Sequence, residues 1–232
     1  MDDSLAFSWL ATALVADACV RLGVDVRVGP AGLRPAAGTG SIAGRVLPAR
    51  HSGSVDTFLE AIDHSVPGDI LVIDNAGSLD EGCVGDLVTL EAVAAGLAGV
   101  VVWGAHRDSA ELRAIGLPVF SLGACPAGPR RTDVPPPDAL AVAHVGAHVV
   151  SPDDWAFADD DGVVFVASGR VDAVLDTASS IHARERQQAA EVRSGISLRS
   201  QLRFHEYIVA RSLRPDLTFR EHLRTIGGAI EE

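Results

Sequence analysis

The sequence predicts an α/β fold, with helices packed on a sheet, followed by a helical C-terminal segment. Two observations indicate this class. Between residues 41 and 121, short apolar runs of strand length alternate with segments whose apolar residues recur at helical spacing. From Val171 to about Leu213 the pattern is helical and strongly charged. With 232 residues, 47% of them hydrophobic, the chain can bury one large core or two small ones.

The N-terminal elements follow from apolar spacing and from turn residues. Leu10, Leu14 and Ala18 share one face of a predicted helix over residues 4–22, which ends at Gly23. Continuous apolar runs bounded by glycine and proline predict buried strands, and helices alternate with them. The predicted order is strand 41–47, helix 55–62, strand 70–74, helix 86–95, strand 99–103, helix 109–114 capped by Ser109, and strand 118–121.

The C-terminal half predicts a second, different organisation. Residues 130–137 are rich in proline and predict a surface connection, residues 139–150 alternate like strands, and an acidic turn at 159–162 leads into strand 163–166. Thr218 and Glu221 form a capping-box pattern that opens a last short helix. The simplest organisation is a core domain over 1–170 and a helical extension over 171–232 that packs on the core or on a neighbouring subunit.

Charge and composition exclude several classes of function. The net charge is −12, which disfavours nucleic-acid partners because phosphate binding needs a basic surface. All 19 basic residues are arginine, so a Schiff-base mechanism through a lysine amine is excluded. Three cysteines far apart indicate no disulfide framework, and no apolar run reaches membrane-spanning length. We therefore expect a cytoplasmic protein without a membrane partner.

The main candidate site lies where two predicted strand–helix units meet. The segment Gly82–Asp86 predicts a glycine-rich loop before a helix, and its free amides would attract an anion. The strand at 99–103 is followed by Arg107 and Asp108, a charged pair with little packing purpose. We expect Arg107 to bind an anionic substrate through two hydrogen bonds, while Asp108 coordinates a hard cation such as Mg²⁺. The alternatives are an ordinary tight turn and a surface ion pair.

Other candidate sites favour structural explanations. Gly38-Thr39-Gly40 matches a dinucleotide fingerprint, but a strand follows it where a helix is required. His144 and His148 lie on strand-like sequence, too far apart to chelate a metal easily. The aspartates at 159–161 predict a solvated turn more readily than a cation site. Cys83 is expected to pack in the core rather than act as a nucleophile.

The motif Gly85-Asp86-Leu87, followed by residues 96–108 ending in Arg107-Asp108, resembles the signature of the regulator of ribonuclease activity A family. That family includes 4-hydroxy-4-methyl-2-oxoglutarate aldolases that also decarboxylate oxaloacetate. The resemblance covers roughly residues 10–170. It implies a swivelling-domain-type β/β/α sandwich, assembled as a homotrimer or homohexamer with sites between subunits.

The resemblance also implies roles for the site residues. Asp108 would be the metal ligand for Mg²⁺ or Mn²⁺, assisted by waters. Arg107 would bind the pyruvyl part of the substrate and stabilise its enolate. Asp86 would hydrogen-bond a water on the metal that shuttles the proton. Backbone amides around Gly85, Asp86 and Leu87 would receive the substrate carboxylate.

His106 departs from the small apolar residue expected before this pair, and the C-terminal extension is longer than in compact members of the family. His106 is equally consistent with a substrate contact and with a positioning role. The resulting hypothesis is a metal-dependent lyase for pyruvyl-containing 2-oxo acids. The alternative is a non-catalytic regulator that restrains a ribonuclease. A methyltransferase is disfavoured because no proper glycine fingerprint is present.

Overall fold

The computed structural model describes residues 7, 9–131 and 133–227, and it divides into two compact units, residues 1–172 and 173–232. Each unit is described by itself. No helix in the described part of the chain combines the length and the apolar character that a bilayer crossing requires.

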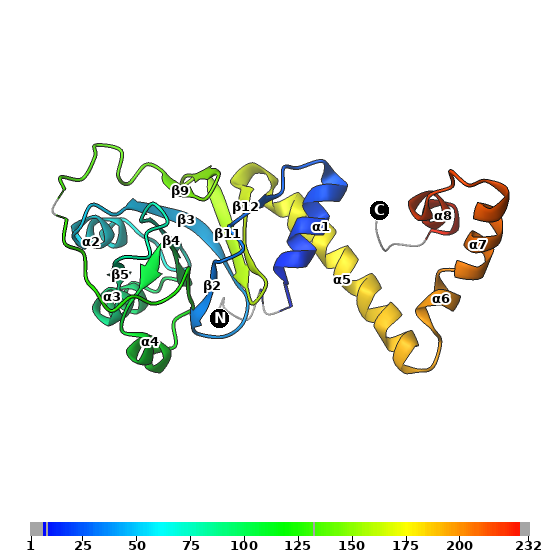
Figure 1. The fold of residues 1–232 in the computed structure, drawn as a ribbon, viewed down its shortest axis with the longest axis horizontal. Coiled ribbons are helices and arrows are strands. Elements are labelled where there is room, and N and C mark those ends of the chain that lie inside the picture. The colour runs from blue at the N-terminus through cyan, green and yellow to red at the C-terminus, as the bar shows by residue number, and fades with distance from the viewer. Residues whose placement is uncertain (1–6, 8, 132, 228–232) are drawn as a thin grey trace. The chain divides into compact units, whose positions relative to one another are not determined.

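The first unit is built on a curled mixed sheet of eight strands in the order β1-β12-β11-β3-β4-β6-β8-β2 (Figure 1). The central strands β3, β4, β6 and β8 are parallel, and the outer strands pair antiparallel. The strands are β1 Arg27–Val28, β2 Arg34–Ala37, β3 Ile42–Arg50, β4 Ile70–Asp74, β6 Gly99–Trp103, β8 Val119–Ser121, β11 Asp154–Asp159 and β12 Gly162–Ala167.

The parallel strands are buried on both faces, which explains their continuous apolar sequences. In β4, Leu71 and Ile73 point into one core, while Ile70 and Val72 point into the other. The first core lies under the helices α2 (Asp56–Asp63), α3 (Asp86–Ala94) and α4 (Ser109–Ile115), which cover one face of the sheet (Figure 1).

The second core lies on the opposite face, between the sheet and a hairpin of β9 (Ala143–Val145) and β10 (His148–Val150). Ala143 and Val145 of the hairpin pack there with Phe120 and Phe165 of the sheet. This layering of helices, sheet and hairpin confirms the predicted α/β class and its β/β/α arrangement.

Helix α1 (Thr12–Leu22) begins later than predicted, and residues 4–6 and 8 of that prediction lie outside the described part of the chain. The carboxylate of Asp159 accepts hydrogen bonds of 2.7 Å from both the backbone nitrogen and the hydroxyl of Thr12. It also accepts one of 2.9 Å from the backbone nitrogen of Asp161. Asp159 therefore ties the turn between β11 and β12 to the first turn of α1.

The second unit consists of helices, as the sequence predicts. They are α5 (Val171–Arg193, which begins in the first unit), α6 (Leu198–Gln201), α7 (Phe204–Leu213) and α8 (Phe219–Ile226). The predicted capping box is present: Thr218 accepts from the backbone of Glu221, and Glu221 accepts from the backbone of Thr218. The rings of Tyr207 and Phe219 pack with centroids 4.9 Å apart and join α7 to α8.

Several short strands were not predicted. The segment Gly82–Val84, expected as a loop, is strand β5 and pairs in parallel with β7 (Ala105–His106). Strands β1, β2 and β11 were also missed, because arginine, proline or aspartate in them interrupts the apolar runs from which strands were predicted.

Candidate active site

The candidate site lies beyond the carboxyl ends of the parallel strands, the usual place for ligand-binding groups in α/β sheets. The pairing of β5 with β7 brings the two predicted segments together, since Val84 faces His106. The backbone nitrogen of Arg107 also donates to the carbonyl of Val84 over 2.8 Å. The start of α3 and the start of α4 are therefore neighbours.

Gly85 packs directly against the charged pair. It is the N-cap of α3, with extended backbone angles that any residue could adopt. A methyl group on Gly85 would collide with Oδ2 of Asp108 and lie 3.1 Å from Nε of Arg107. The absence of a side chain at this position therefore leaves the room that the Asp108 carboxylate occupies. The structure thus brings Gly85, Arg107 and Asp108 together.

Arg107 and Asp108 form a loose and accessible pair. Nε of Arg107 lies 3.3 Å from Oδ2 of Asp108, and the side chains are 45% and 35% exposed. Adjacent residues at the end of a strand usually point in different directions. Asp108 instead adopts a left-handed backbone with φ of 56°, in keeping with its contact to Arg107. The terminal nitrogens of Arg107 donate no hydrogen bond to the described residues, so they are available to an anionic ligand.

Asp86 is the first residue of α3 and is half-buried. Its Oδ1 accepts a hydrogen bond of 2.8 Å from the backbone nitrogen of Leu87, the same amide that the family resemblance assigns to a substrate carboxylate. Within the described part of the chain, Asp86 makes no ion pair with Arg107. A ligand carboxylate at Leu87 would therefore share or displace the Asp86 oxygen.

His106 is buried behind this pair. Its Nδ1 lies 2.7 Å from Oγ of Ser121, and its Nε2 lies 2.8 Å from Oγ of Ser109. Burial lowers the pKa of His106, so the ring is neutral near pH 7. Because both ring nitrogens are engaged, the arrangement favours a positioning role, and a direct substrate contact stays a prediction.

The predicted cap of α4 is wrong. The N-cap is Asp108, whose side chain makes no capping hydrogen bond, and Ser109 is the first helical residue. The hydroxyl of Ser109 bonds to His106 rather than to the helix backbone. The Asp108 carboxylate therefore makes no hydrogen bond to the backbone of α4.

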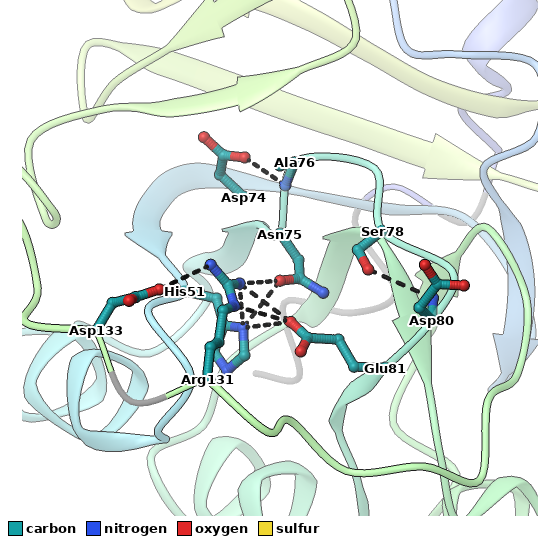
Figure 2. A network of polar contacts seen from close by, with 9 residues as sticks. All are labelled: His51, Asp74, Asn75, Ala76, Ser78, Asp80, Glu81, Arg131 and Asp133. Carbon is teal, nitrogen blue, oxygen red and sulfur yellow. Dashed lines mark hydrogen bonds and ion pairs between the residues drawn. The ribbon is translucent and has the colours of Figure 1, made fainter.

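A second polar cluster at the same edge was missed by the sequence analysis (Figure 2). Arg131 donates from Nε and Nη2 to Oε1 of Glu81 over 3.2 and 3.1 Å, and from Nη2 to Oδ1 of Asn75 over 2.6 Å. Oδ1 of Asn75 also lies 2.8 Å from Nδ1 of His51. His51 and Asn75 follow β3 and β4 directly, and this strand-end position was the available signal.

The proton arrangement in this cluster can be assigned from its acceptors. Nη2 of Arg131 and Nδ1 of His51 are 3.0 Å apart and both point at Oδ1 of Asn75, so both are donors. Nε2 of His51 is buried and has no hydrogen-bond partner among the residues that the structure describes, as expected for the unprotonated nitrogen of a neutral ring. Burial lowers the pKa of His51, which keeps the ring neutral.

The remaining candidates have structural partners. Nδ1 of His144 lies 2.9 Å from Oδ2 of Asp74, whereas Nε2 of His148 lies 3.0 Å from the carbonyl oxygen of Val28. Cys83 is buried, and burial raises its pKa to about 12, which disfavours a nucleophilic thiolate.

A metal at this site would depend on a single protein carboxylate. Among the described residues, no three His, Cys, Asp or Glu side chains group as a metal cage. The accessible carboxylate of Asp108 nevertheless fits Mg²⁺ or Mn²⁺, because such hard cations bind through one or two carboxylates and keep several waters.

A family model described as RraA-like, Aldolase/RraA, matches residues 12–165. The chain belongs to the RraA-like family. Two strains of Xanthomonas campestris pv. campestris carry a relative named "Putative 4-hydroxy-4-methyl-2-oxoglutarate aldolase", which is 41% identical over 106 residues, 45% of this chain. The match spans 63% of the length of those curated relatives.

Two solved structures share the fold. Streptomyces coelicolor RraAS2, described as an unusual member of the RNase ES inhibitor RraA protein family, superposes with a TM-score of 0.65 at 25% identity, over 81% of this chain and 92% of its own. An uncharacterised protein of Pseudomonas syringae pv. tomato superposes with a TM-score of 0.69 at 24% identity, over 82% of this chain and 90% of its own. The second likeness concerns the fold alone.

Proposed function

We propose that this RraA-like chain is a divalent-metal-dependent carbon–carbon lyase for pyruvyl-containing 2-oxo acids. The reaction is retro-aldol cleavage of a 4-hydroxy-2-oxo acid, decarboxylation of oxaloacetate, or both. The observation that supports it best is the convergence of Gly85, Arg107 and Asp108 in one accessible place. The name of the Xanthomonas relative points to the same chemistry.

Both reactions make the same demand on the protein. When the bond beyond carbon 3 breaks, its electron pair passes to the pyruvyl half, which becomes an enolate with negative charge on the keto oxygen. From oxaloacetate, carbon dioxide leaves; from a 4-hydroxy-2-oxo acid, the 4-hydroxyl gives up its proton to water and an aldehyde or ketone leaves. A proton then returns to carbon 3. The exposed terminal nitrogens of Arg107 can hydrogen-bond this developing charge.

The other residues bind and orient in this proposal. Asp108 would hold Mg²⁺ or Mn²⁺, which supplies Lewis-acid stabilisation of negative charge when bound. The backbone amides of Gly85, Asp86 and Leu87, at the positive end of α3, would receive the substrate carboxylate. Asp86 would hold the water that carries the proton. His106, bonded to Ser109 and Ser121, would keep the strand end that carries Arg107 in place.

The assembly and the location belong to the same proposal. We expect a homotrimer or homohexamer in the cytoplasm, where the three cysteines, all free in the structure, would stay reduced. The predicted helical extension over 171–232 would pack on the core or on a neighbouring subunit. No nucleic-acid or membrane partner is proposed.

A regulatory function is the second candidate, because the Streptomyces neighbour is described as belonging to an RNase inhibitor family. In that case the chain would restrain a ribonuclease or another protein without turning over a small molecule. It would form a stoichiometric complex and show no metal-dependent activity. The accessible Arg107 and Asp108 side chains favour the lyase.

The test is oxaloacetate decarboxylation by protein stripped with EDTA, with pyruvate followed by a coupled assay. Because free divalent cations also decarboxylate oxaloacetate slowly, the controls are metal alone and Asp108→Asn protein with the same metal. The proposal predicts turnover that returns with added Mg²⁺ or Mn²⁺ in the wild type and exceeds both controls. Wild-type rates equal to those controls, together with silence on 4-hydroxy-2-oxo acids, would favour the regulatory function.

A further inference from the structure

The segment Gly123–Arg131 runs beside the candidate site and is tied to it by backbone hydrogen bonds. The nitrogen of His106 donates to the carbonyl of Gly123 over 2.9 Å, and the nitrogen of Cys125 donates to the carbonyl of His106 over 2.8 Å. Further along, the nitrogen of Gly82 donates to the carbonyl of Ala127 over 2.8 Å. The segment therefore lies along both short strands that carry the site.

The middle of this segment lies close to the guanidinium of Arg107. A methyl group on Gly128 would lie 2.9 Å from Nη1 of Arg107, and no other heavy atom would come within 4 Å of it. Apart from Nε beside Asp108, the Arg107 guanidinium makes no ion pair with the described residues. The backbone at Gly128 therefore limits the positions that the Arg107 guanidinium can adopt.

The end of the segment is fastened by Arg131. Its side chain bonds to Glu81 and Asn75, both on the loop between β4 and β5 (Figure 2). Its backbone is also enclosed, because a methyl group on Gly53 would collide with the Arg131 carbonyl, and the nitrogen of Asp133 donates to Ser52 over 3.0 Å. Arg131 thus joins the segment to the loops that follow β3 and β4.

We propose that Arg131 is a positioning residue for Arg107, a role that rests on the proposed lyase function. Arg131 holds the end of the segment, and the segment holds Gly128 against the Arg107 guanidinium. Arg131 is unsuited to bind substrate itself. Its Nε and Nη2 are committed to Glu81 and Asn75, and its charge is balanced by the largely buried carboxylate of Glu81.

The first experiment measures the fastening without using activity. Cys125 lies within the segment and is partly covered, whereas Cys19 and Cys83 are buried. The rate at which a thiol reagent labels Cys125 therefore reports how far the segment covers this side chain, and a loosened segment should label faster. In Arg131→Ala we expect labelling about tenfold faster than in the wild type, for the loss of one or two charge-assisted hydrogen bonds. The exposed neighbour Arg130 supplies the matched control, and Arg130→Ala should label like the wild type.

The second experiment measures Arg107 placement through oxaloacetate kinetics. Arg131→Ala should raise KM and lower kcat/KM by about 10²-fold, the effect of a displacement of about 1 Å. A smaller folded fraction would lower kcat alone. Gly128→Ala should raise KM as well while labelling like the wild type, because its methyl meets only the flexible end of Arg107. Arg131→Lys should recover part of the loss through Glu81.

The outcomes separate this role from the proposed function. An inactive wild-type protein contradicts the lyase proposal. An active wild type with unchanged KM in Arg131→Ala and in Gly128→Ala contradicts the positioning role alone. Unchanged Cys125 labelling in Arg131→Ala overturns the fastening on which that role depends.

Discussion

Two arginines lie at the same edge of the sheet, and their surroundings differ in kind. Arg131 donates to Glu81 and Asn75 within one cluster whose other members are largely buried. Among the described residues, the guanidinium of Arg107 forms one ion pair, a contact of 3.3 Å with its half-buried neighbour Asp108. A guanidinium whose hydrogen-bond donors are all used within the protein stabilises the fold, whereas one with free donors can bind a ligand.

The largest expected effect is in Arg107→Ala. Turnover of oxaloacetate should fall by about 10²–10³-fold, as for the loss of an oxyanion donor. The free energy of unfolding should change by no more than about 0.5 kcal/mol, because the pair is exposed. Steady-state kinetics and urea unfolding on the same preparation check both parts. Near-wild-type turnover in Arg107→Ala would contradict a role of Arg107 in the reaction, and with it the proposed functional difference between Arg107 and Arg131.

Gly85→Ala should have the next largest effect. Its methyl would displace the Asp108 carboxylate and crowd Nε of Arg107, so we expect turnover to fall by about 10²-fold. The fold should survive, since the backbone of Gly85 is extended. The matched control is Gly169→Ala, because a methyl there meets nothing within 4 Å. Equal activity of the two variants would contradict the tight packing at Gly85.

Glu81→Gln probes the other arginine. Removal of the carboxylate charge leaves Arg131 with a weaker acceptor, and we expect a loss of about 1–2 kcal/mol in the free energy of unfolding. Glu60→Gln on the exposed face of α2 is the control and should be neutral. Chemical denaturation measures both. No difference between them would mean that the Arg131 cluster contributes nothing to stability.

The smallest effect is a pH dependence of stability. Burial lowers the pKa of both His51 and His106 in the folded protein. Below about pH 6.5 the two histidines therefore bind more protons in the unfolded chain than in the folded chain. The free energy of unfolding falls as the pH is lowered. His106→Gln should flatten the slope of melting temperature between pH 7 and pH 5.5, whereas the exposed His64→Gln should not. Parallel slopes would contradict a buried neutral His106.

The fold was predictable where the sequence pattern is local. The apolar runs of β4 and β6 and the capping box at Thr218 signal their elements directly. Strand β12 follows β11 directly in the chain, but the other partner of β11, strand β3, lies far away, and that pairing is visible only in the structure. The apolar residues of β11 are only the four between Asp154 and Asp159, so the sequence contains no longer apolar run that would mark this strand.

The site was predictable for a related reason. Gly85, Arg107 and Asp108 each adjoin an element that the sequence signals, and parallel strands bring such ends to one edge. Arg131 lies at the start of the proline-rich stretch 130–137, whose path depends on contacts with the loops after β3 and β4. No spacing in the sequence encodes that path, so its pairing with Glu81 required the structure.

The most direct test of the central claim is Mn²⁺ binding, measured by calorimetry with oxalate present as a mimic of the pyruvate enolate. The account predicts that the wild type binds Mn²⁺ at least about tenfold more tightly than Asp108→Asn. It also predicts that Asp160→Asn, in the exposed acidic turn, binds like the wild type. Equal binding by wild type and Asp108→Asn, or a loss confined to Asp160→Asn, would contradict a metal site at the Arg107–Asp108 pair.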